Sequence, residues 1–204
     1  MNESRPPFTW PDDEPALRGA LRPGIWGVER DLLPPAWHTP ALLLAAGAEQ
    51  CLALSLRTAS AYRQLPLPTL LAALNAAGIR LAAKTVLALH ELVVNAIVHG
   101  NLGIDSGPSH SLADLHARDA SIKAALRDPA HANRTVTLAF ASAAEQVEAA
   151  VADEGNGFVM AAGGGECSGR GLAIARAAAR DVRFTAGGRC ARLALRRMPE
   201  PVIC

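Results

Sequence analysis

The sequence has few aromatic residues, no excess of either charge and no long hydrophobic run. Phe, Trp and Tyr make up 4% of its 204 residues, which weakens a role in binding single-stranded nucleic acid by base stacking. Its 20 Lys and Arg residues offset 19 Asp and Glu residues, for a net charge of +1. Composition therefore favours neither nucleic acid nor an anionic membrane, and we expect no direct contact with either.

Paired cysteines, a secretory leader and a membrane-spanning run are also missing. The first seven residues contain no apolar core of a signal peptide. The longest apolar run, 41–56, is interrupted by Glu49 and Gln50 and is too short to cross a bilayer. Four isolated cysteines without a CxxC pair favour reduced thiols over disulfides or a zinc site: Cys51, Cys167, Cys190 and Cys204. These patterns together predict a cytoplasmic protein.

Composition divides the chain into an N-terminal arm, a main domain and a short tail. Residues 1–45 are rich in proline, which leaves little room for regular structure. This arm holds all the tryptophans of the chain: Trp10, Trp26 and Trp37. It either packs them on the domain or docks a partner, because Trp is a frequent interface anchor. We expect one domain over 46–198 and a tail at 199–204.

Hydrophobic periodicity predicts both strands and helices within the domain. Alternation predicts strands at about 49–58, 135–140, 146–152, 182–186 and 189–195, the last two joined as a hairpin. Helical patterns occur at about 66–77, 80–99, 112–126 and 172–180. The third helix lies in a polar insertion at about 103–133 and begins with a capping box formed by Ser111 and Asp114. We therefore expect an α+β fold, a two-layer sandwich whose helices cover one face of a mixed β-sheet.

The helix at 80–99 carries polar side chains on one stripe of an otherwise apolar surface, so burial on most sides is expected. Glu91 and Asn95 are four residues apart on the same face, and His99 continues the stripe. A buried unpaired amide costs ~1–3 kcal/mol, and a buried unpaired carboxylate costs more. The pair indicates a cavity that holds a metal ion, water or phosphate, although a lone buried Glu is more often structural. His99 is interpreted as structural, with its ring capping the helix end.

A second polar feature follows the strand at 146–152. Asp153 comes where this strand ends, and Gly155 and Gly157 behind it permit a tight turn and the close approach of a ligand. A carboxylate in this position accepts hydrogen bonds from an exocyclic amine, the donor that adenine presents. Taken alone, the pattern also fits an ordinary turn after a strand.

A third feature precedes the helix at 172–180. Gly169 and Gly171 open this helix, whose free N–H groups at the first turn suit phosphate oxygens. Many helices begin with glycine, so this pattern alone is weak. The glycine run at 163–165 fits either a mobile lid or a plain flexible loop.

In order and context, these segments resemble the GHKL ATPase superfamily, which includes gyrase, MutL-type proteins, sensor histidine kinases and anti-sigma-factor serine kinases. Residues 91–96 resemble its N box, 153–158 its G1 box and 169–172 its G2 box. The likeness spans about 49–196 and implies the Bergerat or histidine kinase-like ATPase fold. The longer segment 95–101 and the short lid are most similar to the anti-sigma-factor kinases of bacterial partner switching.

The resemblance implies a role for each matched residue. Asn95 would coordinate Mg²⁺ at the ATP phosphates, Glu91 would be the general base for an attacking serine or threonine hydroxyl, and Asp153 would bind the adenine amino group. Two glycines would shape the nucleotide loop: Gly155 and Gly157. The phosphates would meet the G2 box: Gly169, Arg170, Gly171 and Leu172.

The function implied is an ATP-binding anti-sigma factor that is also a protein serine/threonine kinase, with ATP and Mg²⁺ as cofactors. Its partners would be a sigma factor and an anti-anti-sigma (STAS-domain) protein that it phosphorylates. A homodimer is also compatible with the resemblance. Two alternatives stay open: a nucleotide-gated binding switch without turnover, and the catalytic domain of a histidine kinase, to which His90 beside Glu91 bears a superficial resemblance. The polar insertion and the arm go beyond the minimal family pattern and bear on partner choice.

Overall fold

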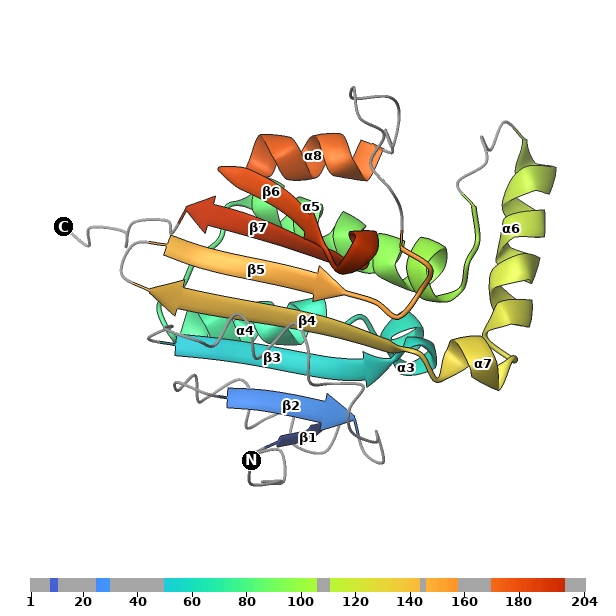
Figure 1. The fold of residues 1–204 in the computed structure, drawn as a ribbon, viewed down its shortest axis with the longest axis horizontal. Helices are drawn as coiled ribbons and strands as arrows, with labels where there is room; N and C mark the ends of the chain where they lie inside the picture. The colour runs from blue at the N-terminus through green and yellow to red at the C-terminus, as the bar shows by residue number, and fades with distance from the viewer. Residues whose placement is uncertain are drawn as a thin grey trace.

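The computed structural model describes residues 8–10, 25–29, 50–105, 111–143, 146–157 and 170–196, and these form one mixed sheet with helices (Figure 1). The strands are β1 (Phe8–Trp10), β2 (Ile25–Glu29), β3 (Gln50–Arg57), β4 (Thr135–Ala143), β5 (Gln146–Ala152), β6 (Asp181–Thr185) and β7 (Cys190–Arg196). Their order across the sheet is β1-β2-β3-β4-β5-β7-β6. β2 pairs in parallel with both β1 and β3, whereas the other pairings are antiparallel. The predicted mixed sheet is confirmed.

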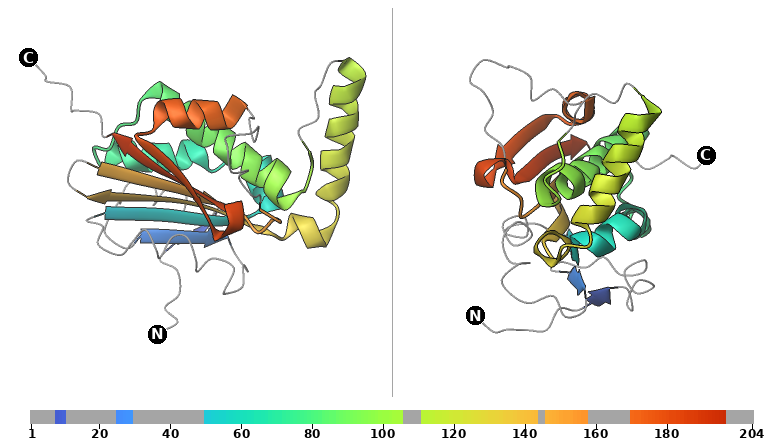
Figure 2. Two further views of the ribbon diagram at one scale, coloured as in Figure 1. Left: turned by 45° about the horizontal axis from the view of Figure 1, so that its top comes forward. Right: turned by 90° about the vertical axis from the view of Figure 1, so that its right-hand side faces the viewer.

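Helices cover one face of this sheet, which confirms the two-layer α+β sandwich (Figure 2). The helices are α3 (Thr58–Arg63), α4 (Leu67–Ala76), α5 (Ala83–Asn95), α6 (Leu112–Ala125), α7 (Pro129–Ala132) and α8 (Arg170–Ala178). A π-helical turn, η1 (Ala96–Asn101), extends α5, and a 3-10 turn, η2 (Ala186–Gly188), joins β6 to β7. Figure 2 shows α4, α5 and α8 on the sheet, while α6 rises away from it.

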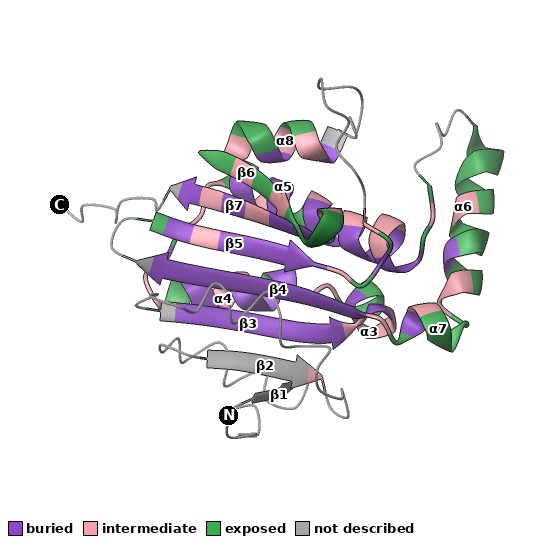
Figure 3. Cartoon of the chain, in the orientation of Figure 1, coloured by how far each residue is buried: buried purple, intermediate pink, exposed green. Residues whose placement is uncertain are grey.

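The main core lies between the sheet and the covering helices, where the purple segments of Figure 3 meet. In β3 and β4, Leu52 pairs with Phe140 and Leu54 with Leu138, and all four side chains are buried. Burying a side chain of this size stabilises the fold by ~1.5–3 kcal/mol. The opposite positions of the strands hold small buried side chains: Cys51, Ala53, Ala139, Ala141, Ala150, Ala152 and Cys190.

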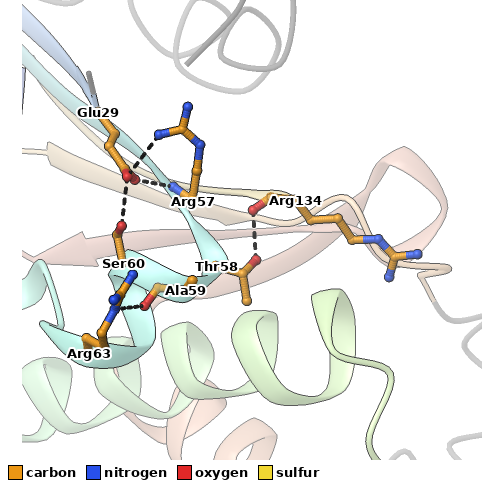
Figure 4. A network of polar contacts seen from close by, with 7 residues as sticks. All are labelled: Glu29, Arg57, Thr58, Ala59, Ser60, Arg63 and Arg134. Carbon is orange, nitrogen blue, oxygen red and sulfur yellow. Dashed lines mark hydrogen bonds and ion pairs between the residues drawn. The ribbon is translucent and has the colours of Figure 1, made fainter. Parts of the chain in front are cut away.

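The expectation of little regular structure in the arm is wrong for two short segments, β1 and β2. These segments extend the sheet beyond β3, which supplies a ready-made edge for backbone hydrogen bonds, so even 3 and 5 residues form strands. Glu29 secures the end of β2 (Figure 4): its carboxylate accepts hydrogen bonds from the Arg57 backbone N–H at 2.7 Å and from Ser60 Oγ at 2.7 Å. The structure describes Trp10 and Trp26 by their backbone alone, and Trp37 and the tail at 199–204 lie outside the described residues.

The predicted helix in the polar insertion is α6, and its capping box is confirmed. The Ser111 Oγ accepts from the Asp114 N–H at 3.2 Å, and the Asp114 carboxylate accepts from the Ser111 N–H at 2.9 Å. The apolar face of α6 is largely exposed, however, with Leu112 at 71% and Leu115 at 53%, whereas Ile122 is buried. Among the helices in the described ranges, none is both long and apolar enough to cross a membrane.

Candidate nucleotide-binding site

Glu91 and Asn95 lie on one face of α5, as predicted, and this face meets the first turn of α8. A Cβ placed on Gly171 would lie 3.1 Å from Asn95 Nδ2 and 3.2 Å from Glu91 Cβ. Both polar side chains are half-buried, and neither forms a hydrogen bond with any described residue. A carboxylate and an amide that lack partners in this part of the chain are available to a ligand.

The α5 helix is less buried than its sequence suggests. His90 is exposed and Leu87 is 49% exposed. The helix also continues past the predicted end at His99, because the π-helical turn η1 carries it to Asn101. Such turns are rare and often occur at functional sites. The His99 Nδ1 donates a hydrogen bond to the Ile104 carbonyl, so its ring fixes the segment after the helix, in line with the structural interpretation of this residue.

The loop after β5 packs directly against η1. A Cβ on Gly100 would lie 2.5 Å from Asp153 Cγ, and a Cβ on Gly155 would lie 2.1 Å from the Gly100 carbonyl oxygen. Gly157 has φ +69°, and a Cβ there would lie 2.1 Å from the Gly187 carbonyl oxygen. Both positions therefore leave no room for a side chain, and Gly157 also adopts a turn conformation that favours glycine. The close approach at both positions is made by the protein's own backbone.

The Asp153 carboxylate is half-buried, and burial raises its pKa to about 6. The hydrogen bond from the Gly155 N–H to Asp153 Oδ1, at 2.9 Å, and the positive charges of Arg189 and Arg134 oppose this rise. The second oxygen, Oδ2, accepts no hydrogen bond from the residues that the structure describes. One carboxylate oxygen is thus free to receive a donor from a ligand.

Asn101 and Glu154 form a ring of hydrogen bonds that sequence reasoning did not foresee. The Asn101 Oδ1 accepts from the Glu154 N–H at 2.7 Å, and its Nδ2 donates to the Thr135 carbonyl at 3.0 Å. The Thr135 N–H donates to Glu154 Oε2 at 2.6 Å, which closes the ring. The sequence signal that could have pointed to this network is Asn101 itself, a polar residue at the end of an apolar helix.

The same network reaches the first residue of α3, Thr58, and the residue before β4, Arg134. Asn101 Nδ2 also donates to Thr58 Oγ1 at 2.8 Å, and the Thr58 hydroxyl donates to the Arg134 carbonyl at 2.7 Å (Figure 4). The Arg134 guanidinium donates a hydrogen bond to the Asn101 backbone carbonyl oxygen at 2.6 Å. The start of α3, the end of η1 and the start of β4 therefore meet beside the Asp153 loop.

The described part of the segment that resembles the G2 box forms the first turn of α8. α8 begins at Arg170, two residues before the predicted start, and Gly171 is buried while Leu172 is half-buried. For Arg170, the structure describes the backbone position alone. Gly169 and the glycine run at 163–165 lie outside the described residues.

The fold is an α+β domain in which Glu91, Asn95 and Asp153 form a candidate nucleotide-binding site. In a comparison with known protein families, the histidine kinase-like ATPase domain matches residues 67–196, more than half of the chain. The chain therefore belongs to the histidine kinase-like ATPase family, whose domain binds ATP. A search of curated proteins gave no match. The matched range contains the three segments that resemble the N, G1 and G2 boxes.

Proposed function

We propose that the protein is an ATP-dependent serine/threonine protein kinase and anti-sigma factor that phosphorylates an anti-anti-sigma (STAS-domain) protein. The observation that carries this proposal is the placement of Glu91 beside Asn95 on α5, against the first turn of α8. A kinase of this type needs a base and a phosphate-binding group on the same side of a nucleotide. The family match and the likeness of residues 95–101 to the anti-sigma kinases support the same assignment.

Asp153 would recognise the adenine base. Its Oδ2 accepts no hydrogen bond within the described residues and suits the amino group of adenine as a donor. Guanine presents a carbonyl oxygen where adenine presents this amine, and two acceptors facing each other repel. The site is therefore expected to prefer ATP to GTP.

The triphosphate would lie between α5 and α8. The first-turn N–H groups of α8 carry partial positive charge that attracts phosphate, and Gly171 lets this turn approach Asn95. The Asn95 amide oxygen is a hard donor of the kind Mg²⁺ accepts, so this residue fits as its protein ligand. Mg²⁺ would neutralise charge on the phosphates during transfer.

In the proposed reaction, the hydroxyl oxygen of a serine or threonine on the partner forms a bond to the γ-phosphorus. The bond from that phosphorus to the β,γ-bridging oxygen breaks, and ADP leaves with the bonding electrons. Glu91 accepts the hydroxyl proton as the new bond forms. The products are ADP and a phosphorylated partner.

Transfer of labelled γ-phosphate from Mg-ATP tests the proposal, with the purified full chain, a cell lysate and the Glu91→Gln variant as control. Acid-stable label on a small second protein, lost in Glu91→Gln although ATP binding persists, is the expected result. Acid-labile label would favour the histidine kinase alternative, and intact ATP binding without label would favour the binding switch. Asn95→Ala should abolish Mg-ATP binding; unchanged affinity in this variant would overturn the site.

A further inference from the structure

We propose that Asn101 is a positioning residue that orients the Asp153 loop for the adenine base and so sets the preference for ATP over GTP. The inference rests on the proposed function, because it concerns the same nucleotide site. Asn101 acts through Asp153 and is not itself assigned a contact with the nucleotide. The Asn101 amide is completely buried and forms hydrogen bonds through both Oδ1 and Nδ2.

The backbone partners of the Asn101 amide define its orientation. The Glu154 N–H can only donate and the Thr135 carbonyl can only accept, so Oδ1 faces Glu154 and Nδ2 faces Thr135. A buried amide with all these groups satisfied has one favourable rotamer, because turning it over would place acceptor against acceptor and donor against donor. The loop therefore contacts a rigid partner.

The bond to Asn101 acts on the peptide group that directly follows the Asp153 α-carbon. On the other side of that carbon, the Asp153 N–H donates to the Arg189 carbonyl at 2.9 Å. The two peptide planes that flank Asp153 are thus each held by a separate hydrogen bond, one with Arg189 just before β7 and one with Asn101 at the end of η1. Together they fix the backbone from which the carboxylate projects, and the Gly155 N–H then holds its Oδ1.

The exposed Glu154 side chain also helps to hold the Asp153 loop in place. Its carboxylate accepts from the Thr135 N–H at 2.6 Å, so Glu154 is held both through its own N–H and through its side chain. Without the Asn101 amide, the Glu154 N–H loses its acceptor and the peptide is free to rotate. The Asp153 carboxylate would then lose its alignment with the amine of adenine, whereas the phosphate-binding groups on α5 and α8 would stay in place.

The preference between nucleotides separates this role from a general effect on stability. Thr137→Val is the matched control, because it removes a buried hydrogen bond of 2.8 Å to Ser55 without touching the site. Glu154→Ala is a second test variant, since it opens the same ring at an exposed side chain and leaves the core intact. The probe is a fluorescent ATP analogue displaced from the full chain by ATP or by GTP, with thermal unfolding measured in parallel.

We expect Asn101→Ala to reduce the ATP-over-GTP preference by about tenfold through weaker ATP binding, with Glu154→Ala changing it in the same direction. Thr137→Val should lower the melting temperature yet keep the preference of the unsubstituted chain. A preserved preference in both Asn101→Ala and Glu154→Ala, with loss in Asp153→Asn, would overturn this inference alone. Lack of any ATP binding by the unsubstituted chain would overturn the proposed function, and this inference with it.

Discussion

The Asp153 carboxylate lies against the α-carbon of Gly100, where the π-helical turn of α5 meets the end of β5. A side chain at Gly100 would begin 2.5 Å from Asp153 Cγ and 2.6 Å from its Oδ1. Gly155 closes the same contact from the loop side. Segments 95–101 and 153–158, far apart in the sequence, thus contact each other directly because Gly100 and Gly155 carry no side chain.

Gly100→Ala should weaken ATP binding by about tenfold or more, because its methyl group displaces the carboxylate proposed to read adenine. Gly103→Ala is the control: Gly103 also sits near the end of η1, at φ +65°, but a Cβ there meets nothing within 4 Å. This control should lose stability through backbone strain alone and keep its ATP affinity. Isothermal titration of both variants makes the comparison, and equal affinities would contradict the expected contact.

Asp153→Asn should stabilise the protein above neutral pH while it removes ATP preference. Burial raises the pKa of Asp153 from 3.8 to about 6, so between these values the folded protein holds a proton that the unfolded chain has released. This contribution to stability is complete below the lower value and is lost as pH rises through about 6. The neutral amide avoids the loss, which after allowance for solvent contact amounts to about 1 kcal/mol.

Thermal unfolding at several pH values measures this effect. The advantage of Asp153→Asn over the unsubstituted chain should be largest at about pH 8 and should shrink at about pH 5. ATP binding should depend on pH in the opposite direction from stability. The Asp153 carboxylate must be ionised to accept a hydrogen bond from the adenine amine, so binding should strengthen as pH rises. The ATP-over-GTP preference of the unsubstituted chain should therefore rise with pH through about 6, and GTP controls for titration of the phosphates.

Thr135→Val should raise stability by about 1 kcal/mol. The Thr135 hydroxyl is buried and is the one buried side-chain polar atom in the described ranges that lacks a hydrogen-bond partner. Valine keeps the shape and removes the unsatisfied group. Urea denaturation should give a higher midpoint for this variant and a lower one for Thr137→Val, which breaks a satisfied bond nearby. A loss of stability in Thr135→Val would show that the hydroxyl has a partner such as bound water.

Glu29→Ala should destabilise the domain by about 2 kcal/mol, since its carboxylate accepts from the Arg57 main chain and from the Ser60 hydroxyl. Glu29→Gln keeps an acceptor oxygen and the side-chain shape, so its cost should be less than half as large. Chemical denaturation compares the two variants. Equal losses would mean that the negative charge, and not the hydrogen bonds, holds β2 in place.

Elements whose sequence signals are local could be predicted from the sequence. The hairpin of β6 and β7 follows from alternation on either side of Gly187 and Gly188, and η2 occupies this turn. The start of α6 follows from Ser111 and Asp114, which satisfy each other's backbone groups. The position of Glu91 and Asn95 on the same face of α5 follows from their helical spacing alone.

Other features depend on contacts between distant segments and had no local signal. β1 and β2 are too short to be predicted, because β2 is stabilised by pairing with β3 and β1 by pairing with β2. The exposure of Leu112 depends on how far α6 stands from the sheet, which periodicity does not determine. The role of Asn101 required knowing that Thr135 and Glu154 would meet it, and strand pairing brings them there.

The position of β3 in the sheet has a practical consequence for shortened forms of the chain. The family match begins at residue 67, yet β3 (Gln50–Arg57) pairs with β4 from Gln50 to Arg57. A fragment beginning at residue 67 would leave one side of β4 unpaired, and an apolar strand edge of this kind invites pairing between molecules. It would also lack Thr58 and with it one anchor of the Asn101 amide. Fragments cut to the matched range should therefore aggregate, whereas those that retain β2 and β3 should stay monodisperse enough for binding studies.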